Sequence, residues 1–225
     1  MSLSKILLLA LLTLISTKNV VIIGDSRACG IANYVLGIDY TWHNSVYGTG
    51  SYIITQSGKS YNGHSIQFIA EVGASCYTFT NSQKAVSSAV YSTLNSASDG
   101  TVVLMWLGVN NLDSSAHYNY YKSIASKYKR LQFIAVSVTG VSSKADVSND
   151  SIKKFNSYLE KQIPKSGLSN FVYKSILKNG NPTEIYDCSQ KTVTFTVTGD
   201  TTDYYGVHYN TNGYKAILNA MLSIM

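Results

Sequence analysis

The feature that most constrains the fold of this chain is a short apolar run, Val20–Ile23, that leads directly into Gly24-Asp25-Ser26-Arg27. Four β-branched residues closed by a turn sequence are typical of a buried parallel strand. Ser26 then lies in the turn after the strand. At the carboxyl edge of an open α/β sheet, such turns hold ligands and reacting groups. Serines also occupy these turns for structural reasons, so the rest of the chain must decide whether Ser26 is reactive.

The remaining sequence alternates between predicted strands and helices. Strands are predicted over 52–55, 65–72, 101–107, 131–138 and 171–173, and helices over 28–36, 81–96, 116–128, 151–163 and 211–225. Asn81 is expected to cap the helix that it begins. Strict alternation over 191–197 indicates an exposed antiparallel strand. The order of elements predicts a three-layer α/β/α sandwich with a mainly parallel, flavodoxin-like sheet of about five strands.

The N-terminus has the pattern of a secretory leader. Lys5 precedes a ten-residue stretch, 6–15, that is apolar except for one threonine and too short to span a bilayer. We therefore predict a signal peptide over 1–17, a single domain over 18–225, and a secreted protein. The alternative interpretation of the leader is a buried N-terminal helix.

Composition limits the partners of the chain. Only 13% of its residues are charged, and its net charge is +6. The lysines lie mainly over 122–130 and 153–165, in the pattern of solvated helix faces, so no nucleic-acid partner is expected. Beyond the leader, no segment is apolar enough for stable membrane insertion. No cofactor is expected, and the oligomeric state stays open.

The chain has three cysteines, Cys29, Cys76 and Cys188, without metal-ligand spacing. In an oxidising compartment they allow one disulfide and one free thiol, and a bridge between Cys29 and Cys76 is one pairing to test. The histidines other than His208 lack partners at ligand spacing, so no metal site is predicted.

Three predicted strand ends carry polar or small residues: Ser26, Gly73 and Asn110. Because the carboxyl ends of parallel strands share one edge, these residues are expected to converge on one cleft. His208 lies in a loop just before the last predicted helix. Ester cleavage needs a nucleophile, a base within hydrogen-bond reach, and donors aimed at the developing oxyanion. The sequence contains all of these parts.

These motifs resemble the sequence blocks of the SGNH or GDSL hydrolases. Gly24-Asp25-Ser26-Arg27 matches the first block, with Arg27 in place of leucine, and Gly73 matches the second. Gly108-Val109-Asn110-Asn111 matches the third, with Asn111 in place of aspartate. Tyr205-Gly206-Val207-His208 matches the last block, usually D-x-x-H. The four blocks extend over nearly the whole predicted mature chain.

The resemblance implies a role for each matched residue. Ser26 would attack the acyl carbonyl, and His208 would act as general base and then as general acid. The Ser26 and Gly73 backbone N–H groups and the Asn110 side-chain amide would form the oxyanion hole, each donor contributing about 10²–10³ in rate. Asp25 and Asn111 are expected to be structural. Arg27 could approach a polar or anionic substrate, or could face solvent.

Tyr205 departs from the family pattern where an aspartate would orient the histidine. Tyrosine does not carry negative charge near neutral pH. Asp203 is the tentative replacement acid, with the nearby Asp200 as a further candidate. Three interpretations stay open: a Ser-His dyad, a triad with a displaced acid, and a weakened site. Losing the orienting charge altogether could cost about 10⁴ in turnover.

The function expected from these features is a secreted serine esterase acting on carboxylic esters, with O-acetyl groups on carbohydrate as the favoured substrate. A polar, tyrosine-rich surface and the lack of a large apolar lid segment favour carbohydrate over lipid, although lipid esters and acyl transfer stay open. The alternative is a catalytically weak or inactive carbohydrate-binding or surface-interaction protein, which Tyr205 and Asn111 favour. A nucleotide binder is disfavoured, because no phosphate-binding glycine pattern is present.

Overall fold

The structure, a computed structural model, describes residues 17–43, 51–55, 58–143, 145–186, 192–194 and 207–225. The predicted signal peptide, except for Thr17, lies outside the described residues, and so does Cys188. Within the described part of the chain, no helix is both long and apolar enough to cross a membrane.

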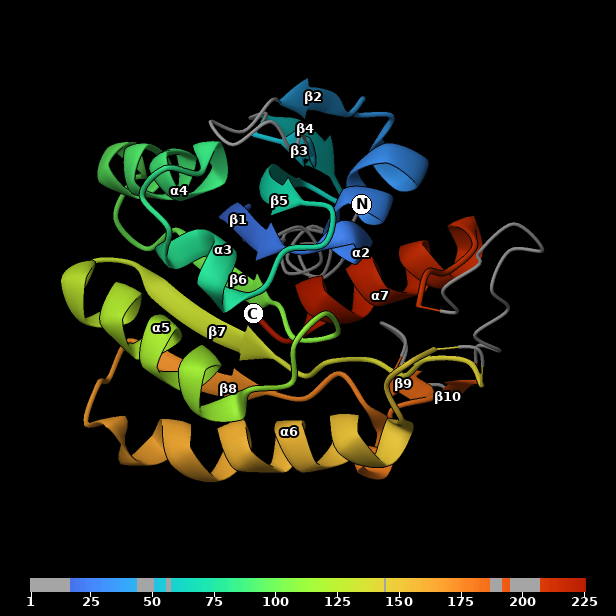
Figure 1. Ribbon diagram of the computed structural model, residues 1–225. Coiled ribbons are helices and arrows are strands. Elements are labelled where there is room, and N and C mark those ends of the chain that lie inside the picture. Colours follow the sequence, from blue (N-terminus) through green and yellow to red (C-terminus); the bar gives the residue numbers. More distant parts are fainter. Residues whose placement is uncertain (1–16, 44–50, 56–57, 144, 187–191, 195–206) are drawn as a thin grey trace, which may run out of the picture.

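The central sheet has eight strands in the order β2-β3-β5-β1-β6-β7-β8, with β4 paired to β5 (Figure 1). Its parallel core consists of β5 (His64–Glu71), β1 (Asn19–Gly24), β6 (Val102–Trp106), β7 (Gln132–Val136) and β8 (Phe171–Lys174). Counted along the chain, these five strands have the spatial order 2-1-3-4-5, which is the flavodoxin-like order. The predicted α/β architecture with five parallel strands is confirmed.

Short antiparallel strands extend the sheet beyond its parallel core, and the strand predicted over 52–55 is one of them, at Ser51–Ile54. β2 (Thr41–His43) and β3 (Ser51–Ile54) continue the sheet at the outer side of β5, and β4 (Lys59–Tyr61) pairs with the first part of β5. β9 (Glu184–Tyr186) and β10 (Thr192–Thr194) form a separate antiparallel pair. The latter lies inside the strand predicted over 191–197. Strands of three residues are too short for a period-two pattern to reveal them.

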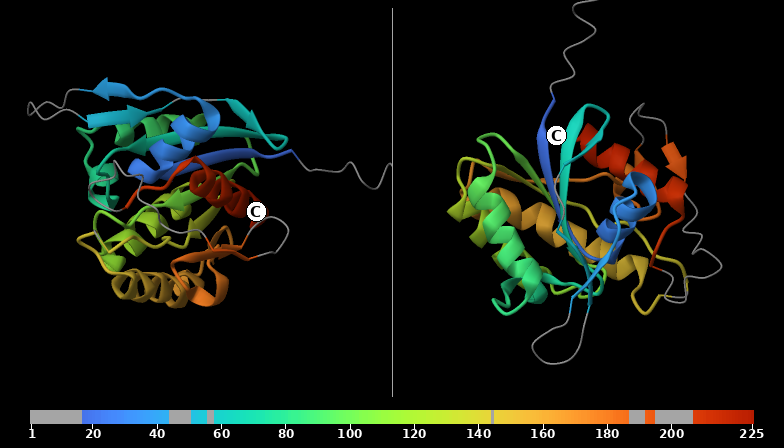
Figure 2. Two further views of the ribbon diagram at one scale, coloured as in Figure 1. Left: turned by 90° about the vertical axis from the view of Figure 1, so that its right-hand side faces the viewer. Right: turned by 90° about the horizontal axis from the view of Figure 1, so that it is seen from above.

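Helices cover both faces of the sheet. α4 (Ala85–Ser96), α5 (Ser114–Lys127) and α6 (Asn149–Gln162) pack on one face, while α2 (Ser26–Gly30), the π-helical turn Ile31–Val35 and α7 (Thr211–Ser223) pack on the other. The view from above in Figure 2 shows α4 and α7 on opposite sides of the sheet. Successive residues of β1 alternate between the two cores, with Val21 and Ile23 in one and Val20 and Ile22 in the other. Burial on both faces explains why this strand is uniformly apolar.

Two local predictions are wrong. Asn81 does not cap α4, because the N-cap of α4 is Lys84. The Asn81 side chain instead accepts a hydrogen bond from the Gln83 N–H, in a turn after the short helix α3 (Cys76–Thr80). The Cys29–Cys76 disulfide does not form either. Both are buried free thiols, and they belong to the cores on opposite faces of the sheet. Burial raises the pKa of Cys29, and raises that of Cys76 to about 11.

Candidate active site

The three predicted strand ends meet at one edge of the sheet, because β1 lies between β5 and β6. Gly24, the last residue of β1, pairs with Ala70 of β5 and with Trp106 of β6. Ser26, Gly73 and Asn110 each follow their strand by a few residues and therefore lie at the same carboxyl edge. This is the edge at which α/β sheets bind ligands.

Ser26 is held by a sharp turn from β1 into α2. A side chain at Gly24 would not fit, since a Cβ there would lie 2.3 Å from the Ala28 Cβ and 3.2 Å from the Trp106 carbonyl oxygen. Asp25 is the N-cap of α2, and its carboxylate accepts a hydrogen bond from the Arg27 N–H at 3.0 Å. Ser26 is consequently the first residue of the helix, with only 7% of its surface exposed.

His208 approaches Ser26 from the other end of the chain. Its Nε2 lies 2.9 Å from the Ser26 Oγ, although the two residues are 182 positions apart. Asn210, two residues later, caps α7 by accepting a hydrogen bond from the Gly213 N–H. α7 packs closely on α2, because Gly30 leaves room for the Tyr214 ring that a Cβ would overlap at 2.2 Å. This packing holds the start of α7, and with it His208, beside Ser26.

The predicted oxyanion donors lie on the two neighbouring strand ends. Gly73 has a φ of +78°, a conformation that side chains rarely adopt. The Asn110 Nδ2 donates a hydrogen bond to the Ala74 carbonyl oxygen at 3.0 Å. An amide nitrogen carries two hydrogens, so this bond orients the Asn110 amide and uses only one of them. The side chain of Asn111 accepts a hydrogen bond from the Asp113 N–H at 2.8 Å and so shapes the turn before α5.

A cavity of about 410 Å³ joins these groups. Its described lining comprises Ser26, Val72, Gly73, Val109, Asn110, Asp146, Val147, Val207 and His208. The structure thus brings together Ser26, Gly73, Asn110 and His208. Asp203 and Tyr205 lie outside the described residues, so the orienting acid stays a prediction.

Sequence reasoning missed Asp146 and the valines on the cavity wall. Asp146 belongs to no motif and lies in the irregular segment between β7 and α6. The signal that could have found it is topological: β7 is the neighbour of β6, so the segment after β7 starts at the same edge as Asn110.

Arg27 is placed differently from either prediction. It neither reaches the cavity nor faces solvent, because it is fully buried. Its Nε and Nη2 each lie 3.3 Å from a carboxylate oxygen of Asp25, and its Nη1 donates to the Thr139 carbonyl oxygen at 3.2 Å. The guanidinium also lies over the Trp106 ring, 4.7 Å from its centre. These contacts join the turn that carries Ser26 to the segment after β7.

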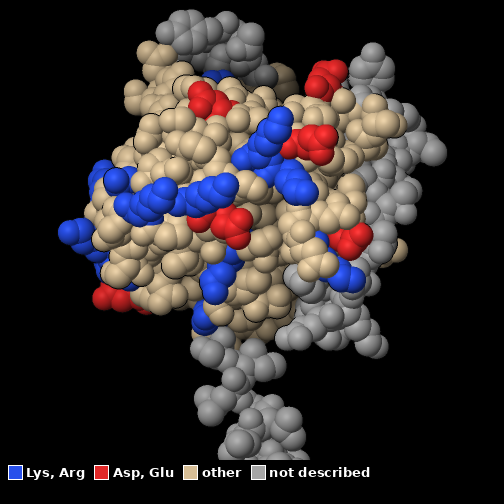
Figure 3. Space-filling view, turned by 90° about the horizontal axis from the view of Figure 1, so that it is seen from below, with Lys and Arg blue, Asp and Glu red and all other residues tan. Residues whose placement is uncertain are grey.

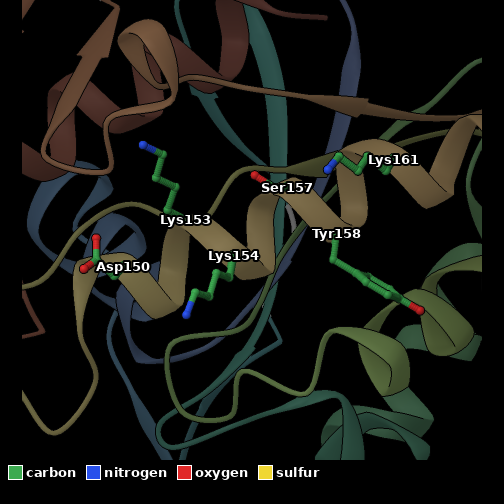
Figure 4. Close-up of a pocket in the computed structure, with 6 residues that line it drawn as sticks. All are labelled: Asp150, Lys153, Lys154, Ser157, Tyr158 and Lys161. Atoms are coloured by element: carbon green, nitrogen blue, oxygen red, sulfur yellow. The ribbon is translucent and has the colours of Figure 1, made fainter.

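A second hollow, on the outer face of α6, is separate from this site. It is lined by Asp150, Lys153, Lys154, Ser157, Tyr158 and Lys161, none of which lines the cavity at Ser26 (Figure 4). Figure 3 shows that lysines and acidic residues are interspersed on the face seen from below. This is the mixed, solvated surface expected for residues 153–165.

No known family model matches the sequence, and no curated protein matches it. Solved structures do match the fold. A carbohydrate esterase family 3 protein from Talaromyces cellulolyticus is 13% identical, with a TM-score of 0.51 over 91% of this chain and 94% of that one. Axe2, an acetylxylan esterase from Geobacillus stearothermophilus, is 10% identical, with a TM-score of 0.51 over 91% and 92%.

The chain shares its fold with these two esterases, which agrees with the fold that the resemblance to the SGNH/GDSL hydrolases implies. A protein from Streptococcus pneumonia described as a platelet activating factor shares it across 100% of this chain and 99% of that one, with 13% identity and a TM-score of 0.53. At such low identity these likenesses establish the fold alone. The activity of this site depends on its own residues.

Proposed function

We propose that this protein is a serine ester hydrolase in which Ser26 is the nucleophile and His208 the general base. The observation that carries the proposal is the 2.9 Å separation of the Ser26 Oγ and the His208 Nε2 at the wall of a cavity. A nucleophile and a base within hydrogen-bond reach, next to a space for a ligand, are the geometric requirements for acyl transfer.

In the first half of the reaction, the Ser26 Oγ bonds to the acyl carbon of the ester while the His208 Nε2 takes the hydroxyl proton. The carbonyl oxygen becomes an oxyanion that the Ser26 and Gly73 N–H groups and the Asn110 amide stabilise. When the intermediate collapses, the bond to the alcohol breaks and His208 gives its proton to the leaving oxygen. An acyl group then remains on Ser26.

In the second half, water replaces the alcohol. His208 takes a proton from water as the water oxygen bonds to the acyl carbon, and then returns it to the Ser26 Oγ as the carboxylic acid leaves. The same donors stabilise the second oxyanion. No metal or redox partner enters this sequence of steps.

We infer that the acyl group is small and that the alcohol belongs to a carbohydrate. Fold neighbours named as an acetylxylan esterase and as a member of carbohydrate esterase family 3 support this substrate class. The described cavity of about 410 Å³ supports it as well, because valines line it beside the polar side chains of Ser26, Asn110, Asp146 and His208. The leader pattern over 1–17 adds secretion to the proposal.

One observation favours a second candidate function, a carbohydrate-binding protein with little or no catalysis: Tyr205 occupies the position of the family's orienting aspartate. The contact between Ser26 and His208 weighs against it, because a binding protein has no need for that hydrogen bond.

Acetate release from acetylated xylo-oligosaccharides and hydrolysis of p-nitrophenyl acetate test the proposal. We expect wild type and Ser88→Ala, a control on the exposed side of α4, to turn over both substrates, and Ser26→Ala and His208→Ala to lose turnover. A wild type no faster than Ser26→Ala would refute the hydrolase. Oligosaccharide binding without acetate release would then support the second candidate.

A further inference from the structure

We propose that Asp146 selects the substrate by charge, favouring esters that are neutral or cationic beside the ester bond and rejecting anionic ones. The inference rests on the proposed function, because it describes which esters reach Ser26. It concerns a residue outside the matched sequence blocks.

Asp146 is the one acidic side chain on the described wall of the cavity, and no lysine or arginine is part of that wall. The rest of the described wall consists of valines, Gly73, Asn110, Ser26 and His208. None of these carries a fixed charge. An ionic group on a substrate therefore meets one fixed charge from the described wall, and that charge is negative.

The Arg27 guanidinium does not cancel the charge of Asp146. Arg27 follows Ser26 directly, yet its guanidinium is fully buried and bound to both carboxylate oxygens of Asp25. The two opposite charges form a compact pair whose field falls off steeply with distance. Asp146 has no such ion pair among the described residues.

The segment that carries Asp146 is anchored at both of its ends. At its start, the Tyr209 hydroxyl donates to the Gly140 carbonyl oxygen at 2.5 Å. At its end, the Asn149 side chain bonds both the N–H and the carbonyl oxygen of Val141, at 2.9 and 3.0 Å. These bonds fix the two ends of the segment, and Asp146 between them lines the cavity together with Ser26 and His208.

The expected size of the effect follows from Coulomb's law. One carboxylate about 5–8 Å from a substrate charge changes its binding by roughly 3- to 10-fold when the effective dielectric constant is about 50–70. Salt reduces this preference, since the screening length is about 8 Å at 0.15 M ionic strength. A preference that arises from shape would not depend on salt.

The test uses phenyl acetate and its 4-carboxylate and 4-trimethylammonium derivatives, which carry no charge, a negative charge and a positive charge. The kcat/KM of each charged ester is divided by that of phenyl acetate for wild type, Asp146→Asn and Asp146→Lys. Comparing variants on the same ester cancels its intrinsic reactivity. Asp150→Asn is the matched control, because Asp150 lies in the first turn of α6 and lines the other hollow.

We expect Asp146→Asn to raise the normalised kcat/KM of the carboxylate ester by about 3- to 10-fold and to lower that of the trimethylammonium ester. Asp146→Lys should extend both changes, Asp150→Asn should cause neither, and 0.5 M salt should shrink them.

Equal ratios in wild type and both Asp146 variants would overturn this inference and leave the hydrolase intact. Loss of phenyl acetate turnover in Asp146→Asn would also overturn it, by making Asp146 part of catalysis. Failure of wild type on all three esters would refute the proposed function itself.

Discussion

The carboxylate of Asp25 and the guanidinium of Arg27 form a completely buried ion pair on either side of Ser26 in the sequence. The pair is tied to β6 and to the segment after β7, because Arg27 also lies over the Trp106 ring and donates to the Thr139 carbonyl oxygen. Burial by itself would lower the pKa of Arg27, but Asp25 and Tyr209 outweigh burial and raise it. The turn that carries Ser26 thus depends on a charge that never meets solvent.

Arg27→Leu, which introduces the residue of the family motif, should destabilise the protein strongly. It leaves the Asp25 carboxylate buried without its cation, and breaking such a pair costs about 3–5 kcal/mol. Urea unfolding measures the loss. The double variant Asp25→Asn/Arg27→Leu should recover part of it, since no unpaired charge remains. A loss below about 1 kcal/mol in Arg27→Leu would contradict the importance of the pair.

Gly30→Ala should reduce turnover by moving α7 and His208 away from Ser26. The added Cβ would lie 2.2 Å from the buried Tyr214 ring, so the ring or the helix that carries it must shift. Overpacking of this kind costs about 1–3 kcal/mol. We expect a lower kcat on p-nitrophenyl acetate, with partial recovery in Gly30→Ala/Tyr214→Leu. Wild-type kcat in Gly30→Ala would mean that this contact does not position His208.

His117 should make the protein sensitive to mild acid. Burial lowers the pKa of His117 below its ordinary value near 6.5, although its Nδ1 lies 2.8 Å from the Asp113 carbonyl oxygen. As the pH falls below about 6.5, the unfolded chain takes up a proton before the folded one does, and stability is lost. His117→Phe removes this contribution and keeps an aromatic ring beside Phe155.

We therefore expect the fall in Tm between pH 7 and pH 5 to be smaller in His117→Phe than in wild type. Thermal unfolding across that range measures it. Parallel Tm curves for the two proteins would show that His117 binds a proton equally well in the folded and the unfolded state. That result would contradict a lowered pKa of His117 in the folded protein.

Asp203, the tentative orienting acid, is tested by Asp203→Asn. If it orients His208, kcat should fall, by up to about 10⁴-fold, as when the aspartate of a triad is neutralised. Unchanged kcat in Asp203→Asn and also in Asp200→Asn would assign the site to a Ser-His dyad. Tyr205→Asp is the companion variant, because a large gain in its kcat would reveal a wild-type site that lacks an orienting charge.

The architecture could be predicted where one physical pattern dominates. β1 and β6 are buried on both faces, so each is an uninterrupted apolar run, and α6 places Ile152, Phe155 and Leu159 at helical spacing toward the core. Strands β2 and β4 could not be predicted, because their three residues gain stability from neighbours in the sheet and not from their own pattern.

The site, too, could be predicted from the sequence only in part. Ser26, Gly73, Asn110 and His208 were identified because each lies in a short motif next to a strand end or helix start. The burial of Arg27 could not be read from the sequence, since it depends on Trp106 from another strand and on a carbonyl oxygen 112 positions away. Asp146 was missed for a related reason: it reaches the cavity only through the order of β6 and β7.

The most direct test of the central claim is covalent labelling of Ser26 by a small fluorophosphonate, followed by intact-mass and peptide analysis. The Ser26 Oγ bonds to phosphorus, fluoride leaves, and His208 takes the hydroxyl proton, as in attack on an ester.

We predict one phosphonyl group per wild-type molecule, located on the peptide that contains Ser26. Ser26→Ala should take up none, and His208→Ala should react at least about 10²-fold more slowly. Labelling of Ser26→Ala at the wild-type rate, or a folded wild type that does not react, would contradict a nucleophilic Ser26 activated by His208.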